Sequence, residues 1–367
     1  MNKLPLNIVQ FASGNTDVLA KYEGMKDYYF HYMSEVAGKK LGAYDSSVSL
    51  AEKETKMHKA LLSEITRVSG QAKPETMEYS VWASSPMVKW ATFAVVGMMI
   101  DAIIPDTIVK NIGIYADIKP IPFGQTLEID IAPNSLFTVS EGANSQRHAF
   151  VQKQFKTTKT IVPVNHVVTV EVALYKVLCG EESLAEFVRK AVIAMETQMT
   201  GDAYDALNTL IDGGSFPEEL KKTGYSVEDL IDLCQITEAY NQGNKPTIIG
   251  TTKALYHVLP DSAKGYRVVT NSEAAGIQLI RNFFDYDIMV LPQVATGRNF
   301  GLKMKDDRIY VMSTGVDKII KGAVEGQTLT NTDDTYANAN LVQKATMNKR
   351  WAFEAVTNAT MGCMIFE

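Results

Sequence analysis

The sequence lacks most of the features that identify an enzyme. It has three cysteines among 367 residues, and they are far apart: Cys179, Cys234 and Cys363. This number and spacing exclude a disulfide framework and indicate buried, reduced thiols. A CxxC pair, the glycine-rich GxGxxG and GxxxxGK[ST] loops and the GxSxG elbow are all absent. No local motif therefore points to redox, nucleotide or nucleophilic chemistry.

Metal-binding patterns are missing as well. The five histidines have no second ligand at the spacings that metal sites use; they are His31, His58, His148, His166 and His257. The acidic pairs Glu181–Glu182, Asp306–Asp307 and Asp333–Asp334 stand beside a helix start or in turns. We expect no catalytic residue, no cofactor-binding residue and no metal ligand, and we predict that the protein is not an enzyme.

Long hydrophobic runs and excess positive charge are also lacking. The strongest apolar run, Trp90 to Ile100, is closed by Asp101, whereas a membrane span needs about twenty residues. We therefore expect a soluble protein without a membrane partner. A net charge of −6 argues against tight binding to a nucleic-acid backbone, but it does not exclude enclosing nucleic acid behind a wall.

One long helix organises the chain. Ser183 and Glu186 form a capping box, and an apolar stripe then continues at helical spacing as far as Ile211. Asp212-Gly213-Gly214 provides the stop signal. Gly201 interrupts the stripe, so a bend is possible there.

A long polar hairpin precedes this helix. Thr126–Ala132 and Val168–Val172 alternate like half-buried strands, and some thirty-five mostly polar residues lie between them. A two-stranded ribbon is marginal by itself in water, and an unstructured loop of this length is unusual. We therefore expect a hairpin that projects and packs on another copy of the chain.

The returning side of this hairpin is basic. It carries Arg147, Lys153, Lys156 and Lys159. These side chains could simply form a solvated strand face. Because the protein as a whole is acidic, we favour an electrostatic contact with a neighbouring subunit.

The first third of the chain is predicted to be helical. Leu50 to Val68 has a capping box at Ser49 and a narrow apolar stripe, which suits either pairing with one partner helix or a solvated surface helix. The following apolar stretch includes Trp82 and Trp90. We expect it to be an arm that lies along another surface, with a short helix starting near Asp106.

The last third alternates short strands and helices, which is typical of a compact α/β domain. We expect helices at Ser226–Tyr240 and Thr252–Leu259, with strands at 246–250, 287–291, 308–312 and 318–324. Gly326–Asn340 reads as a loop rich in Thr, Asn and Asp, and Trp351–Ile365 as a final strand.

The order of these parts resembles the major capsid proteins of tailed double-stranded-DNA bacteriophages, which have the Hong Kong 97 fold. Four segments carry the resemblance: Asp202–Leu207, Lys245–Leu255, Asp306–Val311 and Arg350–Phe353. Two features depart from the family pattern. Phe284–Asp287 stands where many relatives have glycine, and residues 1–75 form an extension that relatives often lack.

The resemblance implies an α+β fold with six parts. They are an N-terminal helical extension (1–75), an N-terminal arm (76–122), an extended hairpin loop (123–164), a peripheral-domain strand with the spine helix (165–225), an axial domain (226–316) and a return to the peripheral domain (317–367). It also implies contacts between subunits, for which Arg147, Lys153, Lys156, Lys159, Trp82 and Trp90 are the candidates.

The function implied is structural. Copies of the chain would assemble into hexamers and pentamers of an icosahedral head, which forms in the bacterial cytoplasm and encloses double-stranded DNA without binding it specifically. Portal, scaffold or decoration proteins are possible partners. Two alternatives stay open: an encapsulin-type nanocompartment shell, and an α/β enzyme whose site is scattered in sequence, using Asp285, Asp287 and His257.

Overall fold

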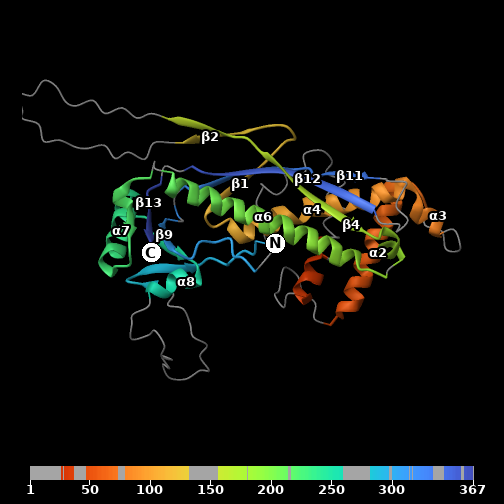
Figure 1. Cartoon of the computed structure of the whole chain (residues 1–367), viewed down its shortest axis with the longest axis horizontal. Helices are drawn as coiled ribbons and strands as arrows, with labels where there is room; N and C mark the ends of the chain where they lie inside the picture. The colour runs from red at the N-terminus through yellow and green to blue at the C-terminus, as the bar shows by residue number, and fades with distance from the viewer. Residues whose placement is uncertain are drawn as a thin grey trace, which may run out of the picture.

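The computed structural model describes residues 26–27, 29–36, 47–72, 79–131, 156–179, 181–213, 216–258, 282–296, 300–313, 315, 317–333, 343–356 and 359–366. Two long helices lie along an elongated body, with one sheet beside them and a second sheet at one end (Figure 1). The mixed α+β class predicted from the sequence is confirmed.

Helix α4, Pro86–Ile112, is the centre of the first core. It follows the short helix α3, Tyr79–Ser84, and continues through Pro105, where the Thr107 hydroxyl donates to the carbonyl oxygens of Ile103 and Ile104 at 3.2 Å. The expected helix start at Asp106 is therefore wrong. Most of this helix is buried within its own chain, and an arm that lies along another surface remains a prediction.

The segment Pro86–Val109 of α4 is long enough and apolar enough to cross a membrane. However, 67% of its most hydropathic stretch is buried inside the protein. This burial is typical of a core helix.

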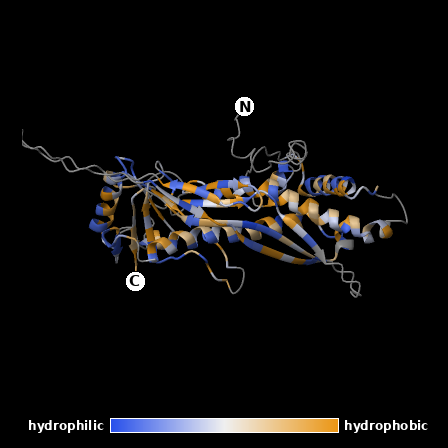
Figure 2. Cartoon of the chain, turned by 90° about the horizontal axis from the view of Figure 1, so that it is seen from above, coloured by the Kyte–Doolittle hydropathy of each residue, from blue (hydrophilic) through white to orange (hydrophobic). Residues whose placement is uncertain are grey.

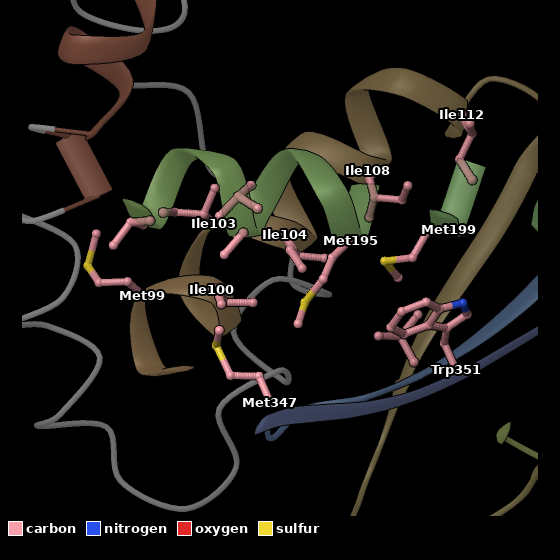
Figure 3. Close-up of a cluster of buried hydrophobic side chains, with 14 of the residues drawn as sticks. Met99, Ile100, Ile103, Ile104, Ile108, Ile112, Met195, Met199, Met347 and Trp351 are labelled. Carbon is pink, nitrogen blue, oxygen red and sulfur yellow. The ribbon is translucent and has the colours of Figure 1, made fainter. Parts of the chain in front are cut away.

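Helix α6, Leu184–Asp212, is the long helix predicted from the capping box, and the Ser183 side chain accepts from the Glu186 amide at 3.2 Å. Its apolar stripe packs against α4. Figure 3 shows Met195 and Met199 beside isoleucines of α4, with Trp351 of strand β12 (Gln343–Ala355) closing the cluster. Gly201 allows a close approach, because a Cβ there would lie 3.2 Å from the Lys303 side chain.

The first sheet has the order β1-β10-β12-β11, and β4 pairs with the other edge of β12. Its strands are β1 (Ala116–Ile121), β4 (Val164–Val172), β10 (Ile320–Glu325), β11 (Leu329–Asp333) and β12 (Gln343–Ala355). Hydrophobic and hydrophilic residues alternate along the long strands (Figure 2), so that one face packs on the helices. The short helix α5, Leu174–Cys179, follows β4.

The expected loop at Gly326–Asn340 is wrong for Leu329–Asp333, which pairs with Asn348–Lys344 of β12. Thr and Asn are compatible with an edge strand whose outer face meets water. The inner face is close-packed: a Cβ on Gly97 of α4 would lie only 3.0 Å from the Thr330 methyl group.

The second sheet has the order β5-β13-β9-β6-β8-β7. Its strands are β5 (Lys221–Thr223), β6 (Thr247–Gly250), β7 (Asn282–Phe283), β8 (Tyr286–Val290), β9 (Arg308–Met312) and β13 (Met361–Ile365). Helices α7 (Val227–Tyr240) and α8 (Thr252–Leu255) pack on it, with short 3-10 turns at Glu218–Leu220 and Tyr256–Val258.

The single strand expected from Trp351 to Ile365 is wrong. The chain forms β12 in the first sheet and then β13 in the second, where β13 pairs with β5 and β9. The C-terminal segment therefore ties the two sheets together.

The N-terminal helices complete the first core. Helix α2, Leu50–Ser69, buries Met57, Leu61 and Ile65 against α4 and α6, so its narrow stripe has its partners within the chain. Tyr29 and Tyr32, in the helical segment 29–36, are also buried. Lys26 forms an ion pair with Asp106 of α4 at 2.8 Å, and both side chains are mostly buried.

Glu196 of α6 carries an unusual buried carboxyl group in this region. Its Oε1 atom is buried without a hydrogen-bond partner, and burial raises the pKa of Glu196, although a hydrogen bond with Thr107 opposes the shift. The folded protein therefore favours the protonated acid. Its contribution to stability is present below the ordinary glutamate pKa and is lost as pH rises through the raised value.

We expect Glu196→Gln to stabilise the protein at pH 8 by about 1 kcal/mol, because the amide needs no charge in this site. At pH 4 the substitution should change stability little. Thermal unfolding of both proteins across this pH range measures the difference. A wild-type protein that becomes more stable relative to the variant as pH rises would contradict the assignment.

A buried ion pair joins α4 to the first sheet. The Lys349 ammonium of β12, whose side chain is 0% exposed, contacts Asp101 of α4. Asp101 also accepts from the Thr328 amide at 2.8 Å and from the Thr328 hydroxyl.

Asp101→Ala should destabilise the protein by about 3–5 kcal/mol, because it leaves a buried ammonium without its counter-charge. The double variant Asp101→Ala, Lys349→Met should recover most of this loss. Chemical denaturation of the single and double variants provides the measurement. Equal destabilisation of the single and double variants would show that the loss of stability does not come from the unpaired ammonium.

Candidate assembly surfaces

The hairpin begins as a two-stranded ribbon. Strands β2 (Leu127–Ile131) and β3 (Thr157–Ile161) pair antiparallel, with Leu127 opposite Ile161 and Ile131 opposite Thr157. The ribbon lies to one side of the body (Figure 1). The predicted tip, Glu141–Gln146, lies outside the described residues.

A small apolar cluster packs the ribbon against the body. Ile129 and Ile161 are buried there against Ile121 of β1 and Ala323 of β10. The rest of β3 is exposed. The described part of the hairpin therefore has a fixed base but little burial of its own.

Hydrogen bonds hold both ends of the hairpin at this base. The buried Glu325 carboxylate of β10 accepts from the Gly124 amide at 3.0 Å and from Arg350 at 2.8 Å. Arg350 of β12 also donates to the Pro163 carbonyl oxygen at 3.0 Å. Because Gly124 precedes β2 and Pro163 follows β3, this root clamp (Gly124, Pro163, Glu325 and Arg350) fixes where the ribbon leaves the body.

The structure pairs two of the predicted contact lysines within the chain. Lys156 forms an ion pair with Asp130 across the ribbon at 2.5 Å, and Lys159 with Glu354 of β12 at 3.3 Å. Hydrogen bonds from Lys156 and Thr158 lower the pKa of Asp130. All four ion-pair side chains are more than a third exposed, so contacts with a neighbour remain a prediction. Arg147 and Lys153 lie outside the described residues.

The two predicted tryptophans differ in exposure. Trp82 of α3 is 5% exposed, and its indole nitrogen donates to the Gln71 carbonyl oxygen at 3.1 Å. Trp90 of α4 is 44% exposed. The ring of Trp90 is therefore the one that offers area to a neighbouring molecule, while that of Trp82 serves mainly its own core.

A polar joint connects α6, β4 and β12. His166 stacks on Trp351 with the ring centroids 3.9 Å apart, and both residues contact the Asp202 carboxylate, at 3.3 and 2.9 Å. Burial would raise the pKa of Asp202, but the hydrogen bonds from His166 and Trp351 hold it below its ordinary value. This joint fixes β4 directly after the hairpin.

Two residues of the enzyme alternative, Asp285 and His257, have different partners. Asp285 is paired with Lys245 on the surface, and His257 stacks on Phe366 with the ring centroids 4.4 Å apart. Phe284 and Asp285 have positive φ in the two-residue turn between β7 and β8, a conformation that glycine adopts more readily than other residues. Among the described residues, no group of His, Cys, Asp and Glu could hold a metal ion.

The root clamp was not predicted from the sequence. Gly124 and Glu325 are 201 positions apart, and no local pattern links them. The most that a sequence could show is a glutamate at the end of an otherwise apolar strand, Ile320–Glu325.

Comparisons with known proteins show to which class of protein this chain belongs. A protein-family model described as "SPbeta prophage-derived putative capsid protein YonB" matches residues 39–365. The class is that of phage capsid proteins, and the chain belongs to this YonB family. The capsid class predicted from the sequence resemblance is thereby confirmed. A comparison with curated protein sequences finds no match.

Solved structures with some similarity are also capsid chains or come from phages. A chain from Microbacterium phage Oxtober96 is 8% identical, with 69% of this chain and 90% of that chain covered and a TM-score of 0.46. A chain from the "Capsid of native GTA particle" is 12% identical, with 70% and 89% covered and a TM-score of 0.47. A chain from the bacteriophage PhiM1 mature capsid is 10% identical, with 69% and 85% covered and a TM-score of 0.43.

We expect Glu325→Ala to loosen the hairpin base, because Arg350 and the Gly124 amide lose their shared acceptor. The loss should be about 1–3 kcal/mol, and chymotrypsin should cut after the exposed Phe123 about ten times faster. Glu354→Ala, which removes only a surface ion pair, is the matched control and should change stability by less than about 0.5 kcal/mol. Equal cleavage rates in the two variants would contradict the role of the clamp.

Proposed function

We propose that this protein is the shell subunit of an icosahedral phage head, in which copies form hexamers and pentamers around double-stranded DNA. The family match supports the capsid role. The particle would assemble in the bacterial cytoplasm, with the protein located in the virion capsid. Its role would be mechanical rather than catalytic, and it would need neither a cofactor nor a membrane.

One observation carries the proposal beyond the family. The ribbon is anchored firmly at its base by the root clamp, yet beyond Ile129 and Ile161 its described side chains are only partly buried or exposed. A segment that is held in direction but not covered is suited to reach a second molecule. The natural second molecule in a shell is another copy of the chain.

The surface around the base supports the same reading. Phe123, Val162 and Val164 are each more than half exposed beside the root clamp. Apolar side chains in such a group favour a protein contact. Trp90 and the lysines of the hairpin are the further contact candidates, and their contribution would add electrostatic selectivity.

The charge suits enclosure of DNA without adhesion. The chain carries 42 acidic and 36 basic residues, giving a net charge of −6. A net acidic wall repels the phosphate backbone, so packaged DNA would not bind tightly. Portal, scaffold or decoration proteins would be further partners of the assembled head.

We also propose the family's division of the chain. Residues 123–164 form the extended loop, 165–225 the peripheral strand and spine helix, and 226–316 the axial domain. The extension 1–75, the arm 76–122 and the return segment 317–367 make up the rest.

The test is to replace residues 134–154 with a short Gly-Ser turn that keeps β2 and β3 paired. We expect an unchanged circular dichroism spectrum but no shells by negative-stain electron microscopy, because the reach to neighbours is gone. The control replaces only Glu141–Gln146 with Gly and Ser at equal length and should still assemble. Normal particles from the shortened variant would remove the hairpin from the mechanism.

The wild-type protein provides the broader test. It should form particles that contain nucleic acid when isolated from infected or induced cells. A folded monomer at all concentrations would contradict the shell proposal, and particles filled with an enzyme instead of DNA would favour a nanocompartment.

A further inference from the structure

Strand β4 forms an open edge of the first sheet. Within the part of the chain that the structure describes, its nine residues, Val164–Val172, pair only with β12. Val168 and Val170 pack on the core. The backbone groups that point away from β12 therefore have no strand to meet.

This edge lacks the usual protection against pairing. Proteins protect their edge strands with lysine, proline, bulges or short length, whereas β4 has neither lysine nor proline and is longer than the usual five or six residues. Val164 is 61% exposed and Val167 is 52% exposed. An edge of this kind is built to be covered by another strand.

The N-terminal segment of the chain has the chemistry to cover it. Residues 4–16 carry no charge, and Leu6-Asn7-Ile8-Val9-Gln10-Phe11 is rich in strand-forming residues. These residues precede Lys26, where the described chain begins with its ion pair to Asp106. Twenty-five extended residues could span up to about 80 Å, which is enough to reach a neighbouring molecule.

Charge gives the direction of pairing. Glu171, near the end of β4, is the only acidic side chain of this strand, and Lys3 is the only charged side chain before Asp17. An antiparallel alignment places Lys3 beside Glu171 and the uncharged residues 6–11 beside the uncharged part of β4.

We propose that the N-terminal segment, residues 4–11, of one copy adds as an antiparallel strand to the β4 edge of a neighbouring copy. This inference rests on the proposed shell function, since it requires copies side by side. It gives the N-terminal segment the role of a tie between subunits, separate from the hairpin.

Mixed cysteine variants, made in chains that also carry Cys179→Ser, test this tie. Chains with Asn7→Cys are co-assembled with chains carrying Val167→Cys, and the particles are oxidised and run on a non-reducing gel. Val167 is exposed, so the substitution should fold, and the native Cys234 and Cys363 are buried. Val227→Cys on α7, also exposed at 43%, replaces Val167→Cys in the control mixture.

We expect a disulfide-linked dimer from the Asn7–Val167 mixture at least tenfold more abundant than from the Asn7–Val227 mixture. Particles that form without this dimer would overturn the tie and leave the shell function intact. Failure of the wild-type protein to form particles would instead contradict the proposed function.

Discussion

The fold depends on the need to cover one apolar helix. Helix α4 has no continuous polar face, so water must be excluded from it on several sides. The chain meets this constraint with three separate elements: α2 on one side, α6 on another, and the inner face of the first sheet, in which β11 lies against Gly97. The N-terminal helices are therefore part of the core and not an appendage. The buried Asp101–Lys349 pair adds a polar contact that fixes how α4 meets the sheet.

Two surface features that the core does not cover, the hairpin ribbon and strand β4, suit the protein to assembly. Among the described residues, the hairpin ribbon has a fixed root but little contact beyond it, and β4, which follows it, pairs on one side only. Both features belong to the same corner of the molecule, next to the joint of His166, Asp202 and Trp351. A stable core with an incomplete periphery is what a shell subunit requires, since assembly energy must come from surfaces that the monomer does not satisfy.

The sequence predicted elements that have a local pattern, but it did not predict contacts between residues far apart in the chain. Helix α6 followed from the cap at Ser183 and its apolar period, and strands β6, β8 and β9 of the second sheet followed from short apolar runs. Pro105 suggested a helix boundary, but tertiary packing carries the helix through it. Leu329–Asp333 reads as a loop until β12 pairs with it. The contact between Glu325 and Gly124 bridges positions that no pattern connects.

The central claim is that the hairpin is completed by other copies of the chain. Hydrogen exchange over residues 123–164, compared between assembled particles and unassembled protein, tests it most directly. The account predicts that the amides of this segment exchange at least tenfold more slowly in the particle, while those of α4 and α6 change little. Equal exchange of the hairpin in both states would contradict it.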